Sequence, residues 1–176
     1  IDKAEKVFYQ MKEVGVFPSK ITYAIMIKGY GQIYCLDSAF KIFEEMKQNS
    51  IEPNEIIYGC LLHACVRSSN VKMLTQVYNE IKANQIEMNI GIYTNLIKAY
   101  TKAKDITTAL DVYHTLLADY KVKVNIIAHN AMLDCCVENN DIKKMNEIYI
   151  QIKEKFYADD NEPQPDLITY STVIKG

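Results

Sequence analysis

The 176-residue sequence has no tryptophan, only four prolines and six glycines, and no strong excess of charge of either sign. Its formal net charge of -2 is not that of a strongly basic nucleic-acid binder, so any contact with nucleic acid must depend on where the charges lie. No stretch approaches the roughly 20 consecutive apolar residues that a membrane-spanning helix needs. The sequence therefore predicts no transmembrane helix and no membrane partner.

The five cysteines form an odd set without a Cys-x-x-Cys pair, which argues against both a disulfide framework and a zinc site. Cys60, Cys65 and Cys136 lie among apolar residues at helical spacing, where a free thiol behaves as a small hydrophobe. The three histidines have no carboxylate or cysteine at metal-ligand spacing. We therefore expect a reducing compartment, no metal and no cofactor.

Catalytic motifs are also missing. There is no glycine-rich phosphate loop, no nucleophile elbow and no pair of carboxylates directed into a pocket. Carboxylates such as Glu44 and Glu45 are interpreted as charge on a helix surface. The sequence therefore predicts neither an enzyme nor a small-molecule substrate.

What the sequence does contain is a repeat of about 35 residues, which is the signature of a solenoid. A tyrosine near the start of each repeat recurs, with a histidine once, at Tyr23, Tyr58, Tyr93, His129 and Tyr170. Core positions of the following helix recur as Ala4, Ala39, Leu74, Ala109 and Met145, and then as Phe8, Phe43, Tyr78, Tyr113 and Tyr149. The tyrosines are expected in the core, each with its hydroxyl near a hydrogen-bond acceptor, and His129 is expected to be a packed core residue.

Each repeat reads as two amphipathic helices joined by a turn. The predicted fold is an all-α, right-handed α-solenoid of helix-turn-helix repeats at 20–54, 55–89, 90–125 and 126–166, with partial repeats at 1–19 and 167–176. Because a repeat buries its apolar face only against its neighbours, the chain is expected to be a segment of a longer array. An insertion around residues 158–165 is predicted to be a surface loop, since Pro163 and Pro165 cannot continue a helix.

The repeat I-T-Y-A-x-x-I-K-G-Y … L-D-S-A-F-K-I-F-E-E-M-K-x-x-x-I-E-P-N resembles the pentatricopeptide repeat, and the resemblance covers essentially the whole chain. The related tetratricopeptide repeat has a slightly shorter period and a tryptophan or Leu-Gly-x-x-Tyr pattern that is absent here. The resemblance implies a protein that binds single-stranded RNA in mitochondria or chloroplasts and reads about one base per repeat.

In that family the reading residues are the one after the tyrosine and the last one of the same repeat. The pairs here are Ala24 with Asn54, Gly59 with Asn89, Thr94 with Asn125, and Asn130 with Asp166, while Ser171 begins a fifth. An asparagine amide complements the pairing edge of adenine, whereas a carboxylate accepts from the ring N–H of uracil or guanine. Together with the family's code, this predicts the reading A-A-A-U.

The residue two before each tyrosine sandwiches the bases in the family. These positions are Ile21, Ile56, Ile127 and Ile168, whereas Gly91 departs from the pattern and has no side chain to clamp a base. Four and eight residues after the reading positions, basic residues are candidates for phosphate contacts. These are Lys28, Arg67, Lys98 and Lys102. The fourth repeat has Asp134 and Glu138 there instead.

Two alternatives stay open at this stage. Stacked helical hairpins also form protein-interaction or structural scaffolds, for example within an organellar ribosome or RNA-processing assembly. Alternatively, the array is the RNA-positioning arm of a larger RNA-processing enzyme. An asparagine or aspartate at the end of every whole repeat favours RNA reading over a peptide groove.

Overall fold

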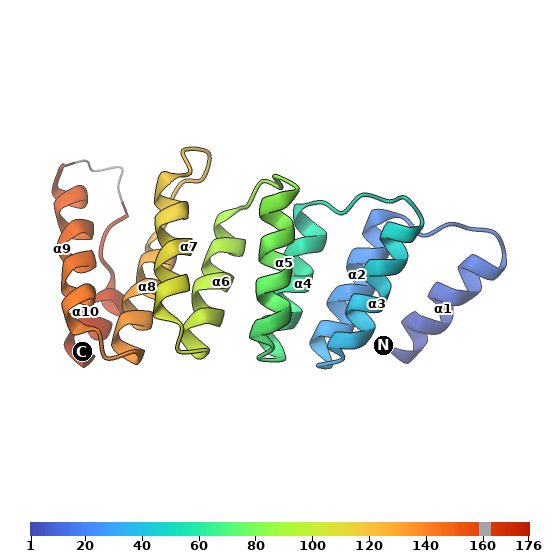
Figure 1. Cartoon of the computed structure of the whole chain (residues 1–176), viewed down its shortest axis with the longest axis horizontal. Coiled ribbons are helices and arrows are strands. Elements are labelled where there is room, and N and C mark those ends of the chain that lie inside the picture. The colour runs from blue at the N-terminus through green and yellow to red at the C-terminus, as the bar shows by residue number, and fades with distance from the viewer. Residues whose placement is uncertain (159–162) are drawn as a thin grey trace. The chain divides into compact units, whose positions relative to one another are not determined.

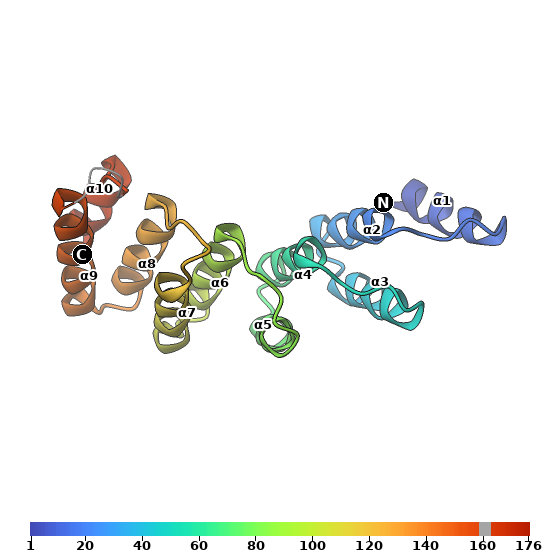
Figure 2. The same ribbon diagram turned by 90° about the horizontal axis from the view of Figure 1, so that it is seen from above.

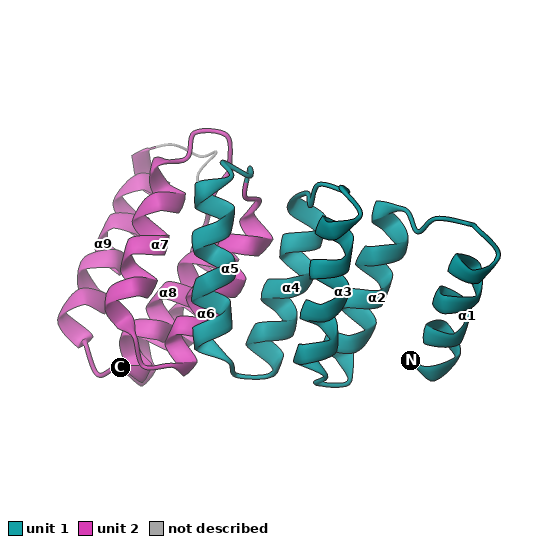
Figure 3. Ribbon diagram, turned by 45° about the vertical axis from the view of Figure 1, so that its right-hand side comes forward, with its two compact units in different colours: residues 1–87 teal, residues 88–176 magenta. Residues whose placement is uncertain are grey.

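The computed structural model describes residues 1–158 and 163–176, and within these residues the chain forms ten α-helices and no strand (Figure 1). The helices are α1 (Asp2–Glu13), α2 (Lys20–Gln32), α3 (Leu36–Gln48), α4 (Glu55–Arg67), α5 (Val71–Ala83), α6 (Ile90–Lys102), α7 (Ile106–Ala118), α8 (Ile126–Glu138), α9 (Ile142–Ala158) and α10 (Leu167–Lys175). They fall into two compact units, residues 1–87 and residues 88–176 (Figure 3). The predicted insertion falls partly on residues 159–162, which lie outside the described residues.

Both units are built on the same plan. In unit 1, α2 packs against its hairpin partner α3 and against α4, and α4 packs against α5. In unit 2, α6 packs against α7 and α8, and α8 packs against α9 and α10. Within each unit the first helices of the hairpins therefore form one row, which can be followed from above in Figure 2. The predicted all-α solenoid of helix-turn-helix repeats is confirmed.

Most helices end in the same way, with one residue in the left-handed backbone region. After the first helices of the hairpins this residue is Tyr34, Ser69, Lys104 or Asn140, with φ between 50° and 62°. In the second hairpin, the Ser69 N–H donates to the Val66 carbonyl (3.2 Å) and the Asn70 N–H to the Cys65 carbonyl (3.0 Å), the Schellman pattern. After α1 this residue is Gly15, with φ 79°.

The core follows the repeat register except toward the ends of the chain, where Tyr149 is also only half-buried. Tyr23, Tyr58 and Tyr93 are buried, but Tyr170 is 47% exposed. The ring of Tyr170 forms an edge-on pair with that of Tyr149 (6.4 Å between centroids). Ala4 is also exposed, because it borders an open apolar groove between α1 and α2 instead of a packed neighbour.

Gly31 has a different role from the one its sequence position suggests. It lies inside α2, is buried, and a Cβ atom built on it would approach the Ala64 Cβ of α4 to 2.8 Å. Gly31 is therefore part of the packing between α2 and α4 and not a residue of the turn. Its missing side chain allows two adjacent first helices to approach closely.

Candidate functional site

The last residue of each repeat is the N-cap of the next first helix. Asn54, Asn125 and Asp166 accept a hydrogen bond from the backbone N–H three residues on, and Ser19 and Asn89 do the same. For Asn54 the distance from Oδ1 to the Ile57 nitrogen is 3.2 Å. A carbonyl oxygen has two lone pairs, so the cap leaves each asparagine one acceptor site and both Nδ2 hydrogens for a ligand. The structural role and the predicted reading role are thus compatible in one side chain.

The fourth repeat brings its two predicted reading residues into direct contact. Asn130, on α8, donates from Nδ2 to Oδ1 of Asp166, the N-cap of α10 (2.9 Å). Thr169, which sequence reasoning missed, donates from Oγ1 to Oδ1 of Asn130 (2.6 Å). The signal for Thr169 was present, because Asp166 and Thr169 have the spacing of a capping box.

The same contacts stabilise the negative charge of the Asp166 carboxylate. The backbone N–H of Thr169, followed by the Asn130 amide, lowers the pKa of Asp166 below its ordinary value. The carboxyl group is therefore ionised at neutral pH and accepts hydrogen bonds only.

The remaining reading positions are arranged differently. Thr94 is buried and its hydroxyl donates to the Ile90 carbonyl of its own helix (2.7 Å), while Asn125 accepts from the Ala128 nitrogen (3.0 Å). Ala24 is half-buried beside the exposed face of α2, and Gly59 is half-buried on α4. Ser171 is exposed, and its hydroxyl donates to the Leu167 carbonyl (2.7 Å).

Large apolar side chains are exposed at a fixed register on the first helices. Between 56% and 72% of the surface of each is accessible, and they are Ile21, Ile56, Ile127 and Ile168. These are the predicted base-sandwiching positions. Soluble domains bury isoleucine where they can, and in both units these isoleucines leave apolar side chains of the first helices open to solvent.

The basic candidates differ in what they contact. Lys28, Lys98 and Lys102 are exposed. Arg67 donates to the Gln32 carbonyl (3.3 Å) and lies over the Tyr34 ring (4.7 Å to the centroid), so it also ties α4 to the turn after α2.

The acidic exception in the fourth repeat also has a structural account. Glu138 accepts from Lys175 of α10 (2.9 Å) and forms an ion pair with Lys104 (3.4 Å), which also donates to the Glu138 backbone carbonyl. Glu138 therefore neutralises two lysines of neighbouring repeats on the edge where the other repeats present basic residues.

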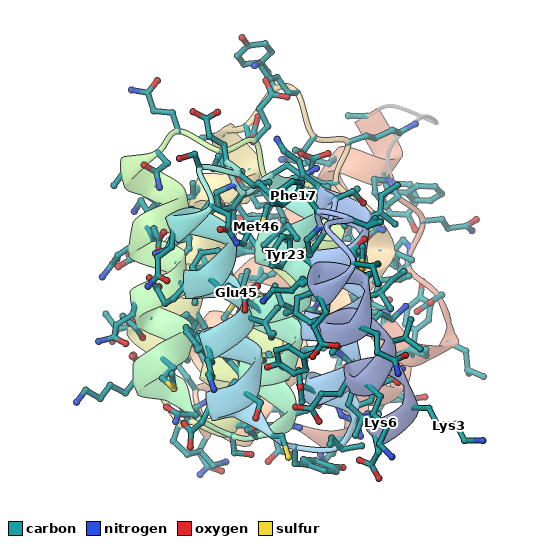
Figure 4. The ribbon with its side chains drawn as sticks, turned by 90° about the vertical axis from the view of Figure 1, so that its right-hand side faces the viewer. Lys3, Lys6, Phe17, Tyr23, Glu45 and Met46 are labelled. Carbon is teal, nitrogen blue, oxygen red and sulfur yellow. The ribbon has the colours of Figure 1, made fainter. Side chains whose placement is uncertain are left out.

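The predicted acceptors for the buried tyrosine hydroxyls are present. Tyr23 donates to Glu45 Oε1 (3.2 Å) and accepts from Asn49 (2.9 Å), and Tyr58 donates to Glu80 in the same way (3.2 Å). Figure 4 shows Tyr23 and Glu45 in the same region of unit 1. Glu45 also pairs with Lys12 (3.0 Å), so the interpretation of Glu45 as plain surface charge is wrong.

His129 is a packed core residue, as predicted. It is 4% exposed, and its Nδ1 shares a hydrogen bond with the Tyr113 hydroxyl (2.7 Å). Burial, and then the positive charge of Lys155, lowers the pKa of His129 to about 4. Burial also raises the pKa of the Cys65 and Cys136 thiols to about 12, so neither is a reactive thiolate at neutral pH.

Residues 1–158 and 163–176 contain no group of three or more histidine, cysteine, aspartate or glutamate side chains placed to hold a metal ion. Over the same residues, none of the helices has the length and apolar character required to cross a bilayer.

The fold and the site together define a class of protein: a solenoid of helical hairpins in which a polar N-cap closes every repeat and an exposed isoleucine recurs beside it. Residues 2–115 match the family described as pentatricopeptide repeat-containing protein, and residues 127–155 match the PPR repeat. The chain therefore belongs to the pentatricopeptide repeat family. No curated protein sequence matches it closely.

Solved structures share this fold. The pentatricopeptide repeat protein PPR10 in complex with an 18-nt psaJ RNA element is 20% identical, with a TM-score of 0.71 over 94% of this chain. The PPR domain of Arabidopsis thaliana protein-only RNase P 1, in complex with tRNA, is 16% identical, with a TM-score of 0.77 over 98% of this chain and 88% of that domain. The chain spans only 23% of the PPR10 chain.

Proposed function

We propose that this chain is a sequence-selective module for single-stranded RNA that reads about one base per repeat. The observation that carries the proposal is the contact between Asn130 and Asp166, which are 36 residues apart and form the reading pair of the fourth repeat. A peptide-binding scaffold has no need for a polar pair at that register. The exposed isoleucines beside it supply apolar surface against which bases can stack.

The chemistry of the fourth pair favours a base with one acceptor next to one ring N–H. Asn130 Nδ2 retains one hydrogen beyond the one given to Asp166, and the second carboxylate oxygen of Asp166 accepts. Uracil offers O4 or O2 and N3–H in this arrangement, and guanine offers O6 and N1–H. The family's code selects uracil, so the proposed reading of the four whole repeats is A-A-A-U.

The cellular setting follows from the family alone. We propose that the repeats at 20–54, 55–89, 90–125 and 126–166 act in a mitochondrion or chloroplast, in RNA processing, stability or translation. We propose no catalytic role for this segment. A second candidate, the RNA-positioning arm of a larger enzyme, is favoured by the likeness to the PPR domain of protein-only RNase P 1.

Binding to short single-stranded RNAs tests the proposal. An RNA containing A-A-A-U should bind more tightly than one containing C-C-C-C, and the affinity should fall as salt rises because lysines release counterions from phosphates. Asn125→Asp should shift the third base from adenine toward guanine. Aspartate caps a helix as well as asparagine does, so this variant changes the reading group without removing the N-cap of α8. Equal affinity for both RNAs would reject sequence-selective reading.

A further inference from the structure

The hydroxyl of Thr169 is the only donor described for the Asn130 carbonyl oxygen. Thr169 is fully buried at the third position of α10, and its Oγ1 lies 2.6 Å from Asn130 Oδ1 and 2.9 Å from Asp166 Oδ1. The same Oγ1 accepts from the Asp166 backbone N–H (3.1 Å). One hydroxyl thus contacts three groups. These are the side-chain oxygen of Asn130, 39 residues away, and the carboxylate oxygen and backbone N–H of Asp166.

Counting hydrogens assigns the direction of each bond. A hydroxyl has one hydrogen, and Asp166 Oδ1 already receives the Thr169 N–H (2.8 Å) and the Asn130 Nδ2 hydrogen (2.9 Å). The Thr169 hydroxyl hydrogen therefore goes to Asn130 Oδ1, which is also the shorter contact. The reversed amide would place Asn130 Oδ1 against Asp166 Oδ1, two acceptors without a hydrogen between them.

We infer that Thr169 is a positioning residue that, together with Asp166, sets the base preference of the fourth repeat by holding the Asn130 amide in one orientation. This inference rests on the proposed function. With its oxygen held by Thr169 and one amide hydrogen held by Asp166, Asn130 directs its second N–H to a ligand, and Asp166 presents a carboxylate oxygen. Cytosine, whose ring nitrogen N3 is an acceptor, would direct that lone pair at the carboxylate and is rejected.

The arrangement distinguishes the fourth repeat from the others. The residue at the same place after the earlier repeats is Ile57, Ile92 or Ala128, none of which has a hydroxyl. The chain offers one matched control, Thr22, which forms the same capping box with Ser19 at the start of α2. Thr22 hydrogen-bonds to Ser19 and to no reading asparagine in the described contacts.

The experiment compares affinities for two RNAs that differ only by uracil or cytosine at the fourth base of A-A-A-U. Thr169→Val keeps the shape of the side chain but leaves Asn130 Oδ1 buried without a donor. It should reduce the preference for uracil over cytosine about five-fold, the equivalent of one hydrogen bond. Thr169→Ser retains the hydroxyl and should retain the preference. Thr22→Val removes the hydroxyl of the exposed capping box and should keep the preference for uracil unchanged.

Thr169→Ala is a second variant without the hydroxyl, so the test does not depend on the folding of a single protein. The inference about Thr169 would be overturned, and the proposed function left standing, by either of two results. One is an undiminished preference for uracil in folded Thr169→Val or Thr169→Ala, and the other is loss of that preference in Thr169→Ser. A wild-type chain that does not distinguish uracil from cytosine would overturn the proposed reading of this repeat and the inference with it.

Discussion

The two units differ in the side-chain ion pairs that join their repeats. Unit 1 places ion pairs between second helices, from Lys12 to Glu45 (3.0 Å) and from Lys47 to Glu80 (3.5 Å). Unit 2 places its polar contacts between first helices, where α8 meets α10 through Asn130 with Asp166 and Glu138 with Lys175. One helix plan thus has two different sets of polar connections.

The contacts in unit 1 repeat with the period of the sequence. Glu45 and Glu80 each accept from the tyrosine of their own hairpin and from a lysine of the preceding one. In unit 2 this pattern is replaced. Tyr93 donates to Asp119 (3.1 Å), and His129 takes the tyrosine position and bonds to Tyr113 instead.

The difference concerns how close the contacts that join repeats lie to the predicted reading residues. In unit 1 the polar contacts that join repeats lie away from the predicted reading positions, whereas in unit 2 they include a reading pair. We therefore expect the fourth repeat to discriminate between bases more strongly than the first, whose pair has only one polar side chain, Asn54. Removing the ion pairs that join repeats should therefore affect folding in unit 1 and ligand binding in unit 2.

The largest expected effect is a loss of stability of unit 2 in acid. The pKa of His129 is about 4 in the folded chain, against an ordinary value of 6.5, so the unfolded chain takes up the proton first as the pH falls. The free energy of unfolding is therefore highest above pH 6.5, where His129 is neutral in both states. It falls by about 3 kcal/mol as the pH drops from 6.5 to 4. Urea unfolding across this range measures it.

His129→Tyr is the control, because tyrosine occupies this register in the first three repeats. The variant should lose the part of the acid sensitivity that wild type shows between pH 6.5 and 4. An identical pH profile for both proteins would mean that His129 is not the titrating group.

The next effect concerns the close approach of first helices in unit 1. Gly31→Val should destabilise the chain by about 2 kcal/mol, because the new side chain meets Ala64 at a distance that no relaxed contact allows. The matching residue in unit 2 is Thr101, which is buried and larger. Thr101→Val should cost less than half as much in thermal unfolding. Comparable losses from the two substitutions would contradict the idea that only α2 and α4 need the missing side chain.

The smallest effect separates the two kinds of ion pair. Glu45→Gln should cost about 0.5–1 kcal/mol of unfolding free energy, since it weakens the partly buried contact to Lys12, and should leave RNA affinity unchanged. Glu138→Gln should leave the melting temperature unchanged and raise RNA affinity about two-fold at low salt, because Lys175 is released for phosphate. The comparison fails if Glu138→Gln weakens binding or if Glu45→Gln alters it.

Several features escaped sequence reasoning for identifiable physical reasons. Left-handed residues such as Tyr34 and Lys104 carry side chains that usually avoid positive φ, and the Schellman hydrogen bonds hold them there. A glycine near the end of a helix, such as Gly31, is typical of a turn. Its contact partner, Ala64, is 33 residues away and has no local signature.

The candidate site was predicted in part. The register gave Asn130 and Asp166 as a pair, but not their direct contact, and it missed Thr169. The expected burial of the tyrosines was confirmed for Tyr23, Tyr58 and Tyr93, while Tyr170 is exposed. The roles of the reading, sandwiching and phosphate residues remain predictions.

The sequence by itself determined the repeat period, the helical hairpins and the polar residue that opens each first helix. These features depend on hydrogen bonds and apolar spacing within a few residues, so a short stretch of sequence specifies them. Only the tertiary structure decided which polar groups meet across repeats, such as Thr169 with Asn130 in unit 2 and Lys12 with Glu45 in unit 1. Such contacts depend on how neighbouring hairpins pack, and a side chain more than thirty residues away leaves no local pattern from which to predict them.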